Sequence, residues 1–332
     1  MTTDTLSDVL RSVRLRGAVF YYLSFGTEWA AEAPAAKDIA GTVIPGAEHV
    51  MEYHVITKGS GWAAITGEPP VRLATGDIVM FPHGDPHVMS SAPGLQPTRM
   101  TADWVHRTRN DPKPIPIVFN TPNEFSYGAP GPDSPTNVAC GFLGCDLRPF
   151  NPLIATLPRL LHLPAASDGA WIGQVMRQAV DASQHKRPGG EAVLERISEM
   201  MFVDAVRRHV ERLPEESTGW LAGLRDRYVG RALALIHENP ARAWTIDALA
   251  DAIALSRSAF YERFIRLIGQ PPMQYLTQWR MQVAANLLRQ SHAPIAAIAL
   301  DVGYESEAAF TRAFKRQVGA PPGAWRRTQN RG

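Results

Sequence analysis

The sequence has very little cysteine and no long apolar run. Only Cys140 and Cys145 occur in 332 residues, far fewer than in a small secreted scaffold held together by disulfides. An uninterrupted run of about 18 apolar residues, enough to cross a bilayer, is absent, and the polar stretch from Met1 to Arg11 lacks the apolar segment of a signal peptide. We therefore expect a cytoplasmic chain with no membrane partner, in which the two cysteines need an explanation of their own.

Net charge is also small, but it is unevenly distributed. The chain carries +2 overall; residues 225–332 hold 15 Lys and Arg against 8 Asp and Glu, a net +7, and the other residues hold 19 against 24, a net −5. A basic segment joined to a mildly acidic one is typical of a polyanion-binding module attached to a module with a different partner. Basic residues that only solvate helices would explain the charge but not its segregation.

Length and hydropathy pattern predict two domains of different class. A chain of 332 residues with 45% apolar content can bury more than one core. Short apolar runs broken by Gly, Pro and Asp predict strands between Val13 and Val105 and again at Asn137–Leu143, whereas helical spacing begins after Asn151. The prolines between Arg107 and Pro135 predict an irregular excursion. The expected fold class is α+β, with an N-terminal β-barrel followed by helices and an all-α C-terminal domain.

The C-terminal segment contains a helix-turn-helix pattern. Thr245 is placed to cap a helix with apolar positions at Ile246, Leu249 and Ile253. After a short break, Ser256 is placed to cap a second helix, Arg257–Arg266. Helix, short turn and helix in this order are typical of a DNA-binding motif.

The same pattern returns further along the chain. Pro294 opens the segment Ile295–Val302, and Ser306 caps Glu307–Gln317. One amphipathic helix, Pro271–Arg289, lies between the two motifs and would hold their second helices at a fixed separation. Two helices held about 34–36 Å apart can read successive major grooves on one face of DNA.

These segments resemble the AraC/XylS family of transcription regulators. The resemblance implies that the second helix of each motif enters the major groove of promoter DNA, and that the protein activates transcription through RNA polymerase; repression by occlusion is equally open. It rests on Ala248-Leu249-Ala250, Leu255-Ser256, Phe260-x3-Phe264, Gly269-x-Pro271-Pro272, Ile298-Ala299, Val302-Gly303-Tyr304, Phe310-x3-Phe314 and Gly319-x-Pro321-Pro322.

The family pattern assigns roles to individual positions on the two recognition helices. Residues on the exposed faces are expected to contact base edges, although each could also be an ordinary solvated residue: Ser258, Tyr261, Glu262, Glu307, Ala308, Thr311 and Arg312. Four basic residues are better placed for phosphates, which position a protein without reading sequence: Arg257, Arg263, Lys315 and Arg316. The aromatic pairs are expected to be core: Phe260, Phe264, Phe310 and Phe314.

The N-terminal part resembles cupins. Gly76-x5-Pro82-x-Gly84-x2-His87 matches the second cupin motif, and Gly46-x5-Glu52-x-His54 resembles the first. Metal-dependent cupin enzymes usually carry His-x-His in the first motif, so the three-histidine iron or manganese site is incomplete. From about Leu6 to Leu163, the sequence is also similar to the cupin-type sensor domain of one branch of AraC-type regulators.

Four residues of this region are predicted to bind zinc: His83, His87, Cys140 and Cys145. Two imidazoles and two thiolates suit a closed tetrahedral Zn²⁺ site, and a spacing of three to five residues is what one chelating turn can span. Two alternatives stay open. Buried cysteines are often small hydrophobes, and this pair could instead form a disulfide under oxidant and act as a switch.

An unknown small-molecule effector is expected in the same domain. His54 is either an additional or substitute metal ligand or a polar group facing the effector, with Trp62 and Phe81 as further pocket candidates. Other aromatic residues could line the pocket or simply belong to the core: Tyr21, Tyr22, Phe25 and Trp29.

The patterns together predict three segments and one function. Residues 1–163 form the cupin-like sensor, 164–218 a helical linker in which Glu191–Val210 offers a homodimer or an interdomain surface, and 219–330 the DNA-binding domain. We expect a sequence-specific transcription regulator controlled by an effector or by metal or thiol chemistry, and not an enzyme. The competing hypotheses are a metal-dependent cupin enzyme fused to a DNA-binding tail, which lacks a complete ligand set, and a cysteine-based redox sensor.

Overall fold

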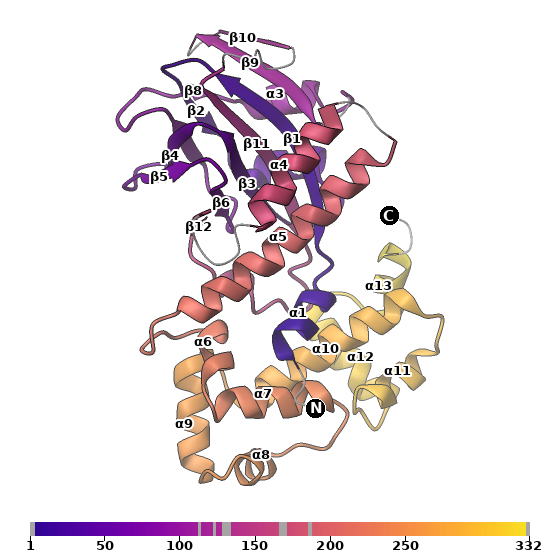
Figure 1. The fold of residues 1–332 in the computed structure, drawn as a ribbon. Coiled ribbons are helices and arrows are strands. Elements are labelled where there is room, and N and C mark those ends of the chain that lie inside the picture. The colour runs from indigo at the N-terminus through magenta and orange to yellow at the C-terminus, as the bar shows by residue number, and fades with distance from the viewer. Residues whose placement is uncertain are drawn as a thin grey trace. The chain divides into compact units, whose positions relative to one another are not determined.

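The computed structural model describes residues 4–111, 114–121, 124–127, 134–165, 171–184 and 188–329. The chain folds into two compact units, both visible in Figure 1. We call them the β-rich unit, which comprises Leu15–Asp146 and Leu157–His209, and the helical unit, which comprises Met1–Arg14, Leu147–Thr156 and Val210–Gly332. Each unit thus combines segments that are distant in sequence. The sequence, in contrast, predicts three segments that follow one another along the chain.

The strands of the β-rich unit form two sheets rather than the closed barrel expected from sequence. In the residues that the structure describes, one sheet has seven strands in the order β10-β9-β1-β11-β3-β6-β12, and the other has five in the order β5-β4-β7-β2-β8. The strands are β1 (Arg16–Phe25), β2 (Ala30–Ala33), β3 (His49–Lys58), β4 (Ser60–Ile65), β5 (Val71–Ala74), β6 (Ile78–Phe81), β7 (His87–Ser90), β8 (Thr98–Arg99), β9 (Ile115–Thr121), β10 (Glu124–Tyr127), β11 (Thr136–Cys145) and β12 (Leu161–Leu163).

The core of this unit lies between the two sheets. Leu23 and Val138 from the larger sheet pack in one apolar cluster with Leu73 and Met89 from the smaller sheet. All ten residues of β11 are buried, which explains why this strand reads as an almost continuous apolar run rather than an alternating one. The segment expected to be irregular between Arg107 and Pro135 contributes β9 and β10, because Ile115, Ile117 and Phe119 alternate into the core despite the nearby prolines.

Within the described residues of this unit, four helices accompany the sheets: α2 (Ala36–Val43), α3 (Ala102–Arg107), α4 (Trp171–Gln184) and α5 (Gly190–Arg212). The hydroxyl of Tyr53 on β3 lies 2.5 Å from Ser198 Oγ on α5 and donates to the Ala18 carbonyl on β1. A Cβ on Gly141 would lie 2.3 Å from that hydroxyl, so only glycine leaves room for it. The small residues of β1 and β11 therefore let α5 pack close to the sheet.

The helical unit contains both expected helix-turn-helix motifs. Thr245, Ser256 and Ser306 each accept a hydrogen bond from a backbone N–H in the first turn of the helix that follows, which confirms the predicted caps. No helix in the described part of the chain is both long enough and apolar enough to span a membrane. The helices are α1 (Thr5–Ser12), the 3₁₀ turn η1 (Ile154–Thr156), α6 (Trp220–Arg225), α7 (Val229–Glu238), α8 (Ile246–Ala252), α9 (Arg257–Ile268), α10 (Pro272–Gln290), α11 (Ile295–Asp301), α12 (Glu307–Val318) and α13 (Pro322–Gln329).

Helix α10 connects the two motifs and receives two segments from far away in the sequence. Gln282 in the middle of α10 is only 1% exposed. Its Nε2 donates to the carbonyl of Ser12 at 2.8 Å, and its Oε1 accepts from the backbone N–H of Phe150 at 3.0 Å. One amide side chain therefore forms hydrogen bonds with backbone groups of both α1 and the 147–156 segment.

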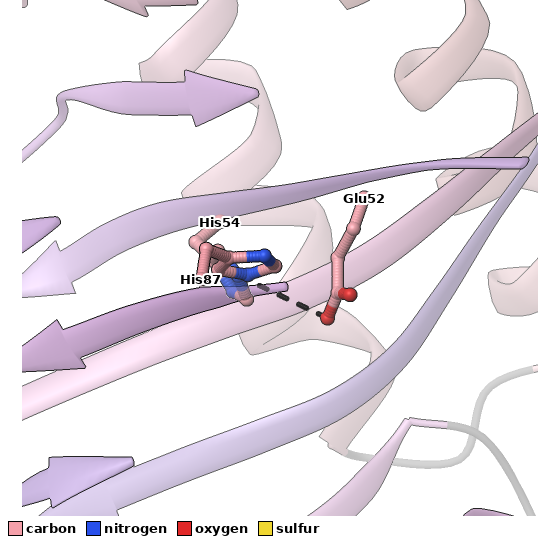
Figure 2. Close-up of side chains that lie close together, drawn as sticks. All are labelled: Glu52, His54 and His87. Atoms are coloured by element: carbon pink, nitrogen blue, oxygen red, sulfur yellow. Dashed lines mark hydrogen bonds and ion pairs between the residues drawn. The ribbon is translucent and has the colours of Figure 1, made fainter. Parts of the chain in front are cut away.

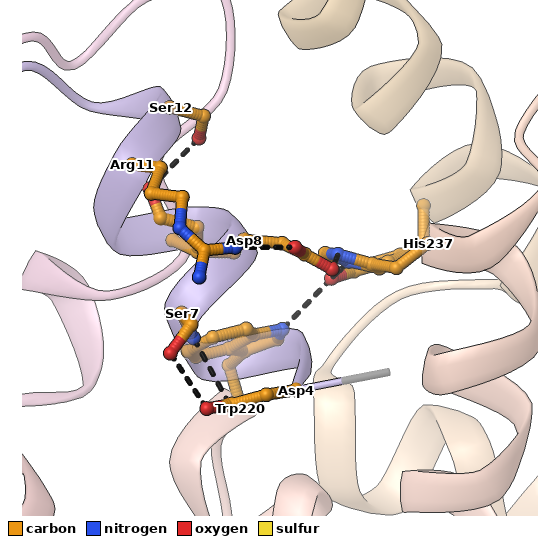
Figure 3. Close-up of polar contacts among 9 residues, drawn as sticks. Asp4, Ser7, Asp8, Arg11, Ser12, Trp220 and His237 are labelled. Atoms are coloured by element: carbon orange, nitrogen blue, oxygen red, sulfur yellow. Dashed lines mark hydrogen bonds and ion pairs between the residues drawn. The ribbon is translucent and has the colours of Figure 1, made fainter. Parts of the chain in front are cut away.

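A second polar cluster joins α1 to α7 (Figure 3). Trp220 Nε1 donates to the hydroxyl of Tyr275, which lies 2.9 Å from His237 Nε2, while Asp8 Oδ2 lies 3.7 Å from His237 Nδ1. The tyrosine hydroxyl can donate its own proton to His237 only if that nitrogen is unprotonated. Burial lowers the pKa of His237, against the opposing pull of the Asp8 carboxylate, so the contact with Asp8 involves a neutral imidazole at neutral pH.

Replacing Gln282 with leucine is expected to destabilise the helical unit. Gln282→Leu removes both hydrogen bonds and leaves the buried Ser12 carbonyl and the partly buried Phe150 N–H unsatisfied, each costing about 1–3 kcal/mol. Chemical denaturation should show that the free energy of unfolding falls by at least the cost of one such group. Gln290→Leu, at the exposed end of the same helix, should change it by no more than about 0.5 kcal/mol. Equal effects of the two changes would contradict this role for Gln282.

His237 should make stability depend on pH in a defined direction. Below about pH 6.5 the unfolded imidazole takes up a proton, whereas the buried one in the folded state resists it. The unfolded state then binds more protons, so the free energy of unfolding falls as the pH falls from about 7.5 to 5.5. Denaturation at several pH values should show a smaller loss in His237→Gln than in the wild type. His292→Gln, at an exposed position, should keep the wild-type dependence; an unchanged dependence in His237→Gln would refute the assignment.

Candidate functional site

Two strands, β3 and β7, bring a buried cluster of ionisable side chains together. Glu52 and His54 are two residues apart on β3 and so point to the same face of the sheet, and His87 opens β7 in the other sheet. Among the residues that the structure describes, these three are the only group of His, Cys, Asp or Glu whose candidate ligand atoms all lie within 4.8 Å of one another. Figure 2 shows both imidazoles beside the Glu52 carboxylate.

The hydrogen bonds of the two imidazoles leave their Nε2 atoms facing each other. His87 Nδ1 donates to the backbone carbonyl of Asp85 at 2.9 Å, and His54 Nδ1 lies 2.9 Å from Cys140 Sγ. The two Nε2 atoms are 2.7 Å apart. A metal-binding histidine usually has its other ring nitrogen held by such a partner, because this fixes the tautomer and the ring orientation.

The turn that carries His87 is firmly held. Arg159 makes two hydrogen bonds to the Asp85 carboxylate, and this contact keeps the pKa of Asp85 below its usual value. Gly84 has φ +68°, and a Cβ there would lie 2.8 Å from both the Val50 carbonyl and the Ala36 side chain. The Pro82-x-Gly84 part of the cupin motif thus positions His87 by leaving room for a tight backbone turn.

Burial makes the cluster electrically neutral. Desolvation raises the pKa of Glu52 to about 8 and lowers the pKa of His87 to about 4; it also lowers the pKa of His54 well below its ordinary value, with His87 adding to that effect. Glu52 Oε1 lies 3.9 Å from His54 Nε2. Because both groups are uncharged near pH 7, this contact is not an ion pair. All three residues are less than 10% exposed.

The cluster has the chemistry of a divalent-cation site. Glu52 Oε2 is buried and has no hydrogen-bond partner among the residues that the structure describes, a costly state unless a ligand supplies one. Two neutral imidazoles and a carboxylate match the donor set that non-haem iron, zinc and manganese proteins use. A cation would also favour ionisation of Glu52, because a positive charge nearby lowers a carboxyl pKa. The residues therefore fit a bound metal ion.

A small cavity adjoins the cluster. Its volume is about 40 Å³, room for roughly three water molecules at 10–15 Å³ each. Glu52, His54, His87 and Cys140 are among its lining residues, and the remaining lining is mainly apolar, including Tyr21, Leu23, Phe25, Met89, Val138 and Phe142. A ligand here would meet a few polar groups within an otherwise apolar surface.

The structure does not bring the four predicted zinc ligands together. His83 Nε2 donates to the carbonyl of Leu157 instead. Cys140 and Cys145 lie five residues apart on the continuous strand β11, so they point to opposite faces and are about 17 Å apart along it. The prediction of a single site from His83, His87, Cys140 and Cys145 is therefore wrong in its ligand set, because the local spacing of each pair says nothing about which sheet face it occupies.

The same strand geometry excludes a disulfide between these cysteines. A disulfide needs Cα atoms within about 7 Å of each other. Both thiols are buried, and burial, with a contribution from Glu52, raises the pKa of Cys140 well above its usual value. A thiol with so little thiolate reacts slowly with oxidants. The pair thus lacks the features of an intramolecular redox switch.

The structure places the side chains predicted to face an effector in different surroundings. His54 lines the cavity, as do Tyr21 and Phe25. Phe81 stacks on the His87 ring with centroids 3.6 Å apart and thus supports the cluster. Trp62 is half-buried and lies on the opposite face of β4 from Ala63 and Ile65, which belong to the core. The alternation of that strand therefore points Trp62 away from the core.

The sequence offered a signal for the residue that was missed. Glu52 belongs to the Glu-x-His of the first cupin motif, where the spacing of two places both side chains on one strand face. Comparison with His-x-His marks Glu52 as a departure from the motif and does not identify it as a ligand. Cys140 lies opposite His54 in the paired strands. This pairing depends on long-range register, and local spacing does not predict it.

The recognition helices expose most of the positions expected to contact DNA. On α9, Arg257, Ser258, Tyr261 and Glu262 are exposed, and on α12 so are Glu307, Ala308, Arg312, Lys315 and Arg316, whereas Thr311 is half-buried. Phe260, Phe264, Phe310 and Phe314 are fully buried, which confirms them as core. Both helices therefore present one polar face outward and one aromatic face inward.

Two of the arginines expected to contact phosphates have partners within the protein. The Arg263 guanidinium donates to both carboxylate oxygens of Asp226, which also accepts from the backbone N–H groups of Tyr228 and Val229. Arg263 thus holds α9 to the start of α7 and is not available for DNA in this state. Arg257 makes a longer, exposed contact with Asp247 at 3.2 Å, a pair that a phosphate could readily displace because exposed ion pairs contribute little.

Comparison with known proteins agrees with both parts of the structure. The Cupin family model matches residues 4–211, and a helix-turn-helix domain model matches residues 249–328. An AraC-like transcription regulator of Streptomyces lividans is 33% identical over 330 residues, 98% of each chain. The HTH-type transcriptional regulator AlkR of Acinetobacter baylyi is 27% identical over 328 residues, 97% of this chain and 99% of the relative.

Among solved structures, the DNA-binding domain of AdpA in complex with a target DNA matches at 29% identity. The match covers 32% of this chain and 95% of that one, with a TM-score of 0.31. The matches to the S. lividans regulator and to the Cupin family extend over most of the chain. The chain therefore belongs to the AraC-type transcription regulators that carry an N-terminal cupin domain.

Proposed function

We propose that this regulator reads promoter DNA with α9 and α12 and that a metal ion, together with a small effector, occupies the cavity of the β-rich unit. The observation that carries the proposal is the convergence of His54, His87 and Glu52 in a buried cavity on a chain whose family binds DNA. The relatives are named as transcription regulators, and the chain is not an enzyme.

The residues proposed to contact DNA lie on the outward faces of the two recognition helices. Base-edge contacts are assigned to Ser258, Tyr261, Glu262, Glu307, Ala308, Thr311 and Arg312, and phosphate contacts to Arg257, Lys315 and Arg316. The exposure of all but the half-buried Thr311 supports the assignment, as does the net charge of +7 over residues 225–332, because phosphate neutralisation supplies much of the binding free energy.

The metal ion would be held by the Nε2 atoms of His54 and His87 and by the Glu52 carboxylate. Zinc, iron and manganese all accept this donor set, and zinc stays the first ion to test. The ion would supply an attachment point for a polar group of the effector. An effector with a small polar head and a compact apolar body suits the cavity, and a body larger than a few water molecules would displace lining side chains such as Ile39 and Val105.

Helix α5 supports a homodimer. Its exposed side chains follow one another at intervals of three and four residues: Val193, Arg196, Met200, Val203 and Arg207. Val193 and Met200 are 52% and 49% exposed, and the two arginines pair with Glu199 and Asp204 on the same helix. A stripe of this spacing pairs helices in coiled coils. Two chains joined in this way would offer four recognition helices to a pair of half-sites.

The effector must bias two states of the protein for regulation to occur, since a ligand that binds both states equally shifts nothing. We propose activation through contact with RNA polymerase at promoters in the cytoplasm, as the family membership suggests. Occlusion of the promoter is the alternative mode.

Loss of Arg312 should weaken specific binding more than non-specific binding. An arginine that pairs with a guanine contributes about 1–3 kcal/mol of discrimination, so Arg312→Ala should lose roughly tenfold or more on a site selected from random DNA by the wild type. Fluorescence anisotropy on that site and on a scrambled duplex measures both losses. Arg72→Ala, exposed on β5 of the β-rich unit, is the matched control and should change neither.

Lys315 should act differently if it contacts a phosphate. Lys315→Ala is expected to weaken binding to both duplexes alike and to reduce the slope of log K against log salt by about 0.9. The same anisotropy titrations at several salt concentrations measure the slope. A sequence-dependent loss with an unchanged slope would mean that Lys315 does not contact the backbone.

Metal content distinguishes the proposed ligands from the cysteine-based set. Elemental mass spectrometry of purified protein reloaded with Zn²⁺ is expected to give about one ion per chain in the wild type and in Cys145→Ser. His87→Ala and Glu52→Gln should lose most of it, with circular dichroism confirming that each variant is folded. Loss in Cys145→Ser but not in Glu52→Gln would overturn the proposed site.

A further inference from the structure

Cys140 has a polar contact that its place in an apolar core does not require. The strand pairing sets it directly opposite His54, and its Sγ lies 2.9 Å from His54 Nδ1. Cys140 is 3% exposed and packs among the core residues of the β-rich unit. A small hydrophobe would fill the same space, but it could not interact with the imidazole.

An imidazole offers only one nitrogen to a given metal ion. His54 Nε2 faces His87 Nε2 and Glu52 at 2.7 and 3.9 Å, so a metal at the proposed site would take the Nε2 lone pair. The proton of the neutral ring then sits on Nδ1, where Cys140 Sγ is the atom within reach. In this geometry the sulfur contacts the side of the ring that faces away from the proposed ion and is not itself one of its ligands.

His87 has the same arrangement through a different acceptor. Its Nδ1 is held by the backbone carbonyl of Asp85 at 2.9 Å, which is independent of side-chain identity. Of the two imidazoles, only His54 has a side chain as the partner of its Nδ1. A mutation of Cys140 can therefore change the orientation of His54.

We propose that Cys140 is a positioning residue for the metal centre. It accepts the His54 Nδ1–H, selects the tautomer that presents Nε2, and holds the ring toward His87 and Glu52. This inference rests on the metal site proposed above. It assigns the thiol a role in metal affinity that differs from that of a ligand in a closed tetrahedral site and from that of a disulfide switch.

Side-chain replacements separate positioning from packing. Serine keeps an acceptor for the imidazole N–H and alanine does not, so Cys140→Ala should lower Zn²⁺ affinity by about 10–100-fold, and Cys140→Ser should stay within a few-fold of the wild type. If Cys140 only fills space, the order changes, because alanine suits an apolar site at least as well as a buried hydroxyl. Cys145→Ala is the matched control, a buried cysteine on the opposite face of the same strand, and should bind as the wild type does.

The experiment is a competition titration of full-length protein with Zn²⁺ against a chelator, repeated with Co²⁺, whose visible absorption reports on the ligand geometry. Thermal unfolding of each metal-free variant shows that it is folded. Weaker binding and an altered Co²⁺ spectrum in Cys140→Ala, restored in Cys140→Ser, support the proposal. Equal affinities in the wild type and Cys140→Ala would overturn it while leaving the metal site intact, and a wild type that binds neither ion would overturn both.

Discussion

The antiparallel pairing of β3 with β11 is the constraint on which the sensor part of this regulator depends. Its register places Cys140 opposite His54 and Phe142 opposite Glu52, and the burial of both strands keeps water away from all of these groups. Shifting the pairing by one residue would turn Glu52 and His54 to the other face of the sheet. The position of the proposed metal ligands is therefore a property of the whole sheet.

Burial also explains why the side chains of the cluster are uncharged near neutral pH. Removing a carboxylate from water without a partner costs free energy. Burial therefore favours the protonated form of Glu52 and raises its pKa to about 8. The depressed pKa values of His54 and His87 have the same origin. A cation at the proposed site would favour the ionised form of Glu52 and would thereby change the electrostatics of the core.

The sequence predicted the helical part of the protein well because its determinants are local. Cap residues such as Ser256 and Ser306, and the buried pair Phe310 and Phe314, act within a few residues of their own position. The two domain classes and the family followed from such patterns. The proposed metal site depends instead on the register and alternation of strands far apart in the chain. Local spacing points to His83 and Cys145, but His83 Nε2 donates to the Leu157 carbonyl, and strand alternation places Cys145 on the opposite face of β11 from Cys140.

The path of the polypeptide between its two units bears on how such proteins can be recombined. From the helical unit the chain enters the β-rich unit at residue 15, returns to the helical unit at 147, goes back to the β-rich unit at 157 and leaves it again at 210. A fusion that joins this sensor to a different DNA-binding module at a single point would leave α1 and the 147–156 segment without Gln282, the residue that accommodates both. Exchange of modules therefore requires matched changes at three places in the gene, and the two units are expected to diverge together rather than to be shuffled as independent domains.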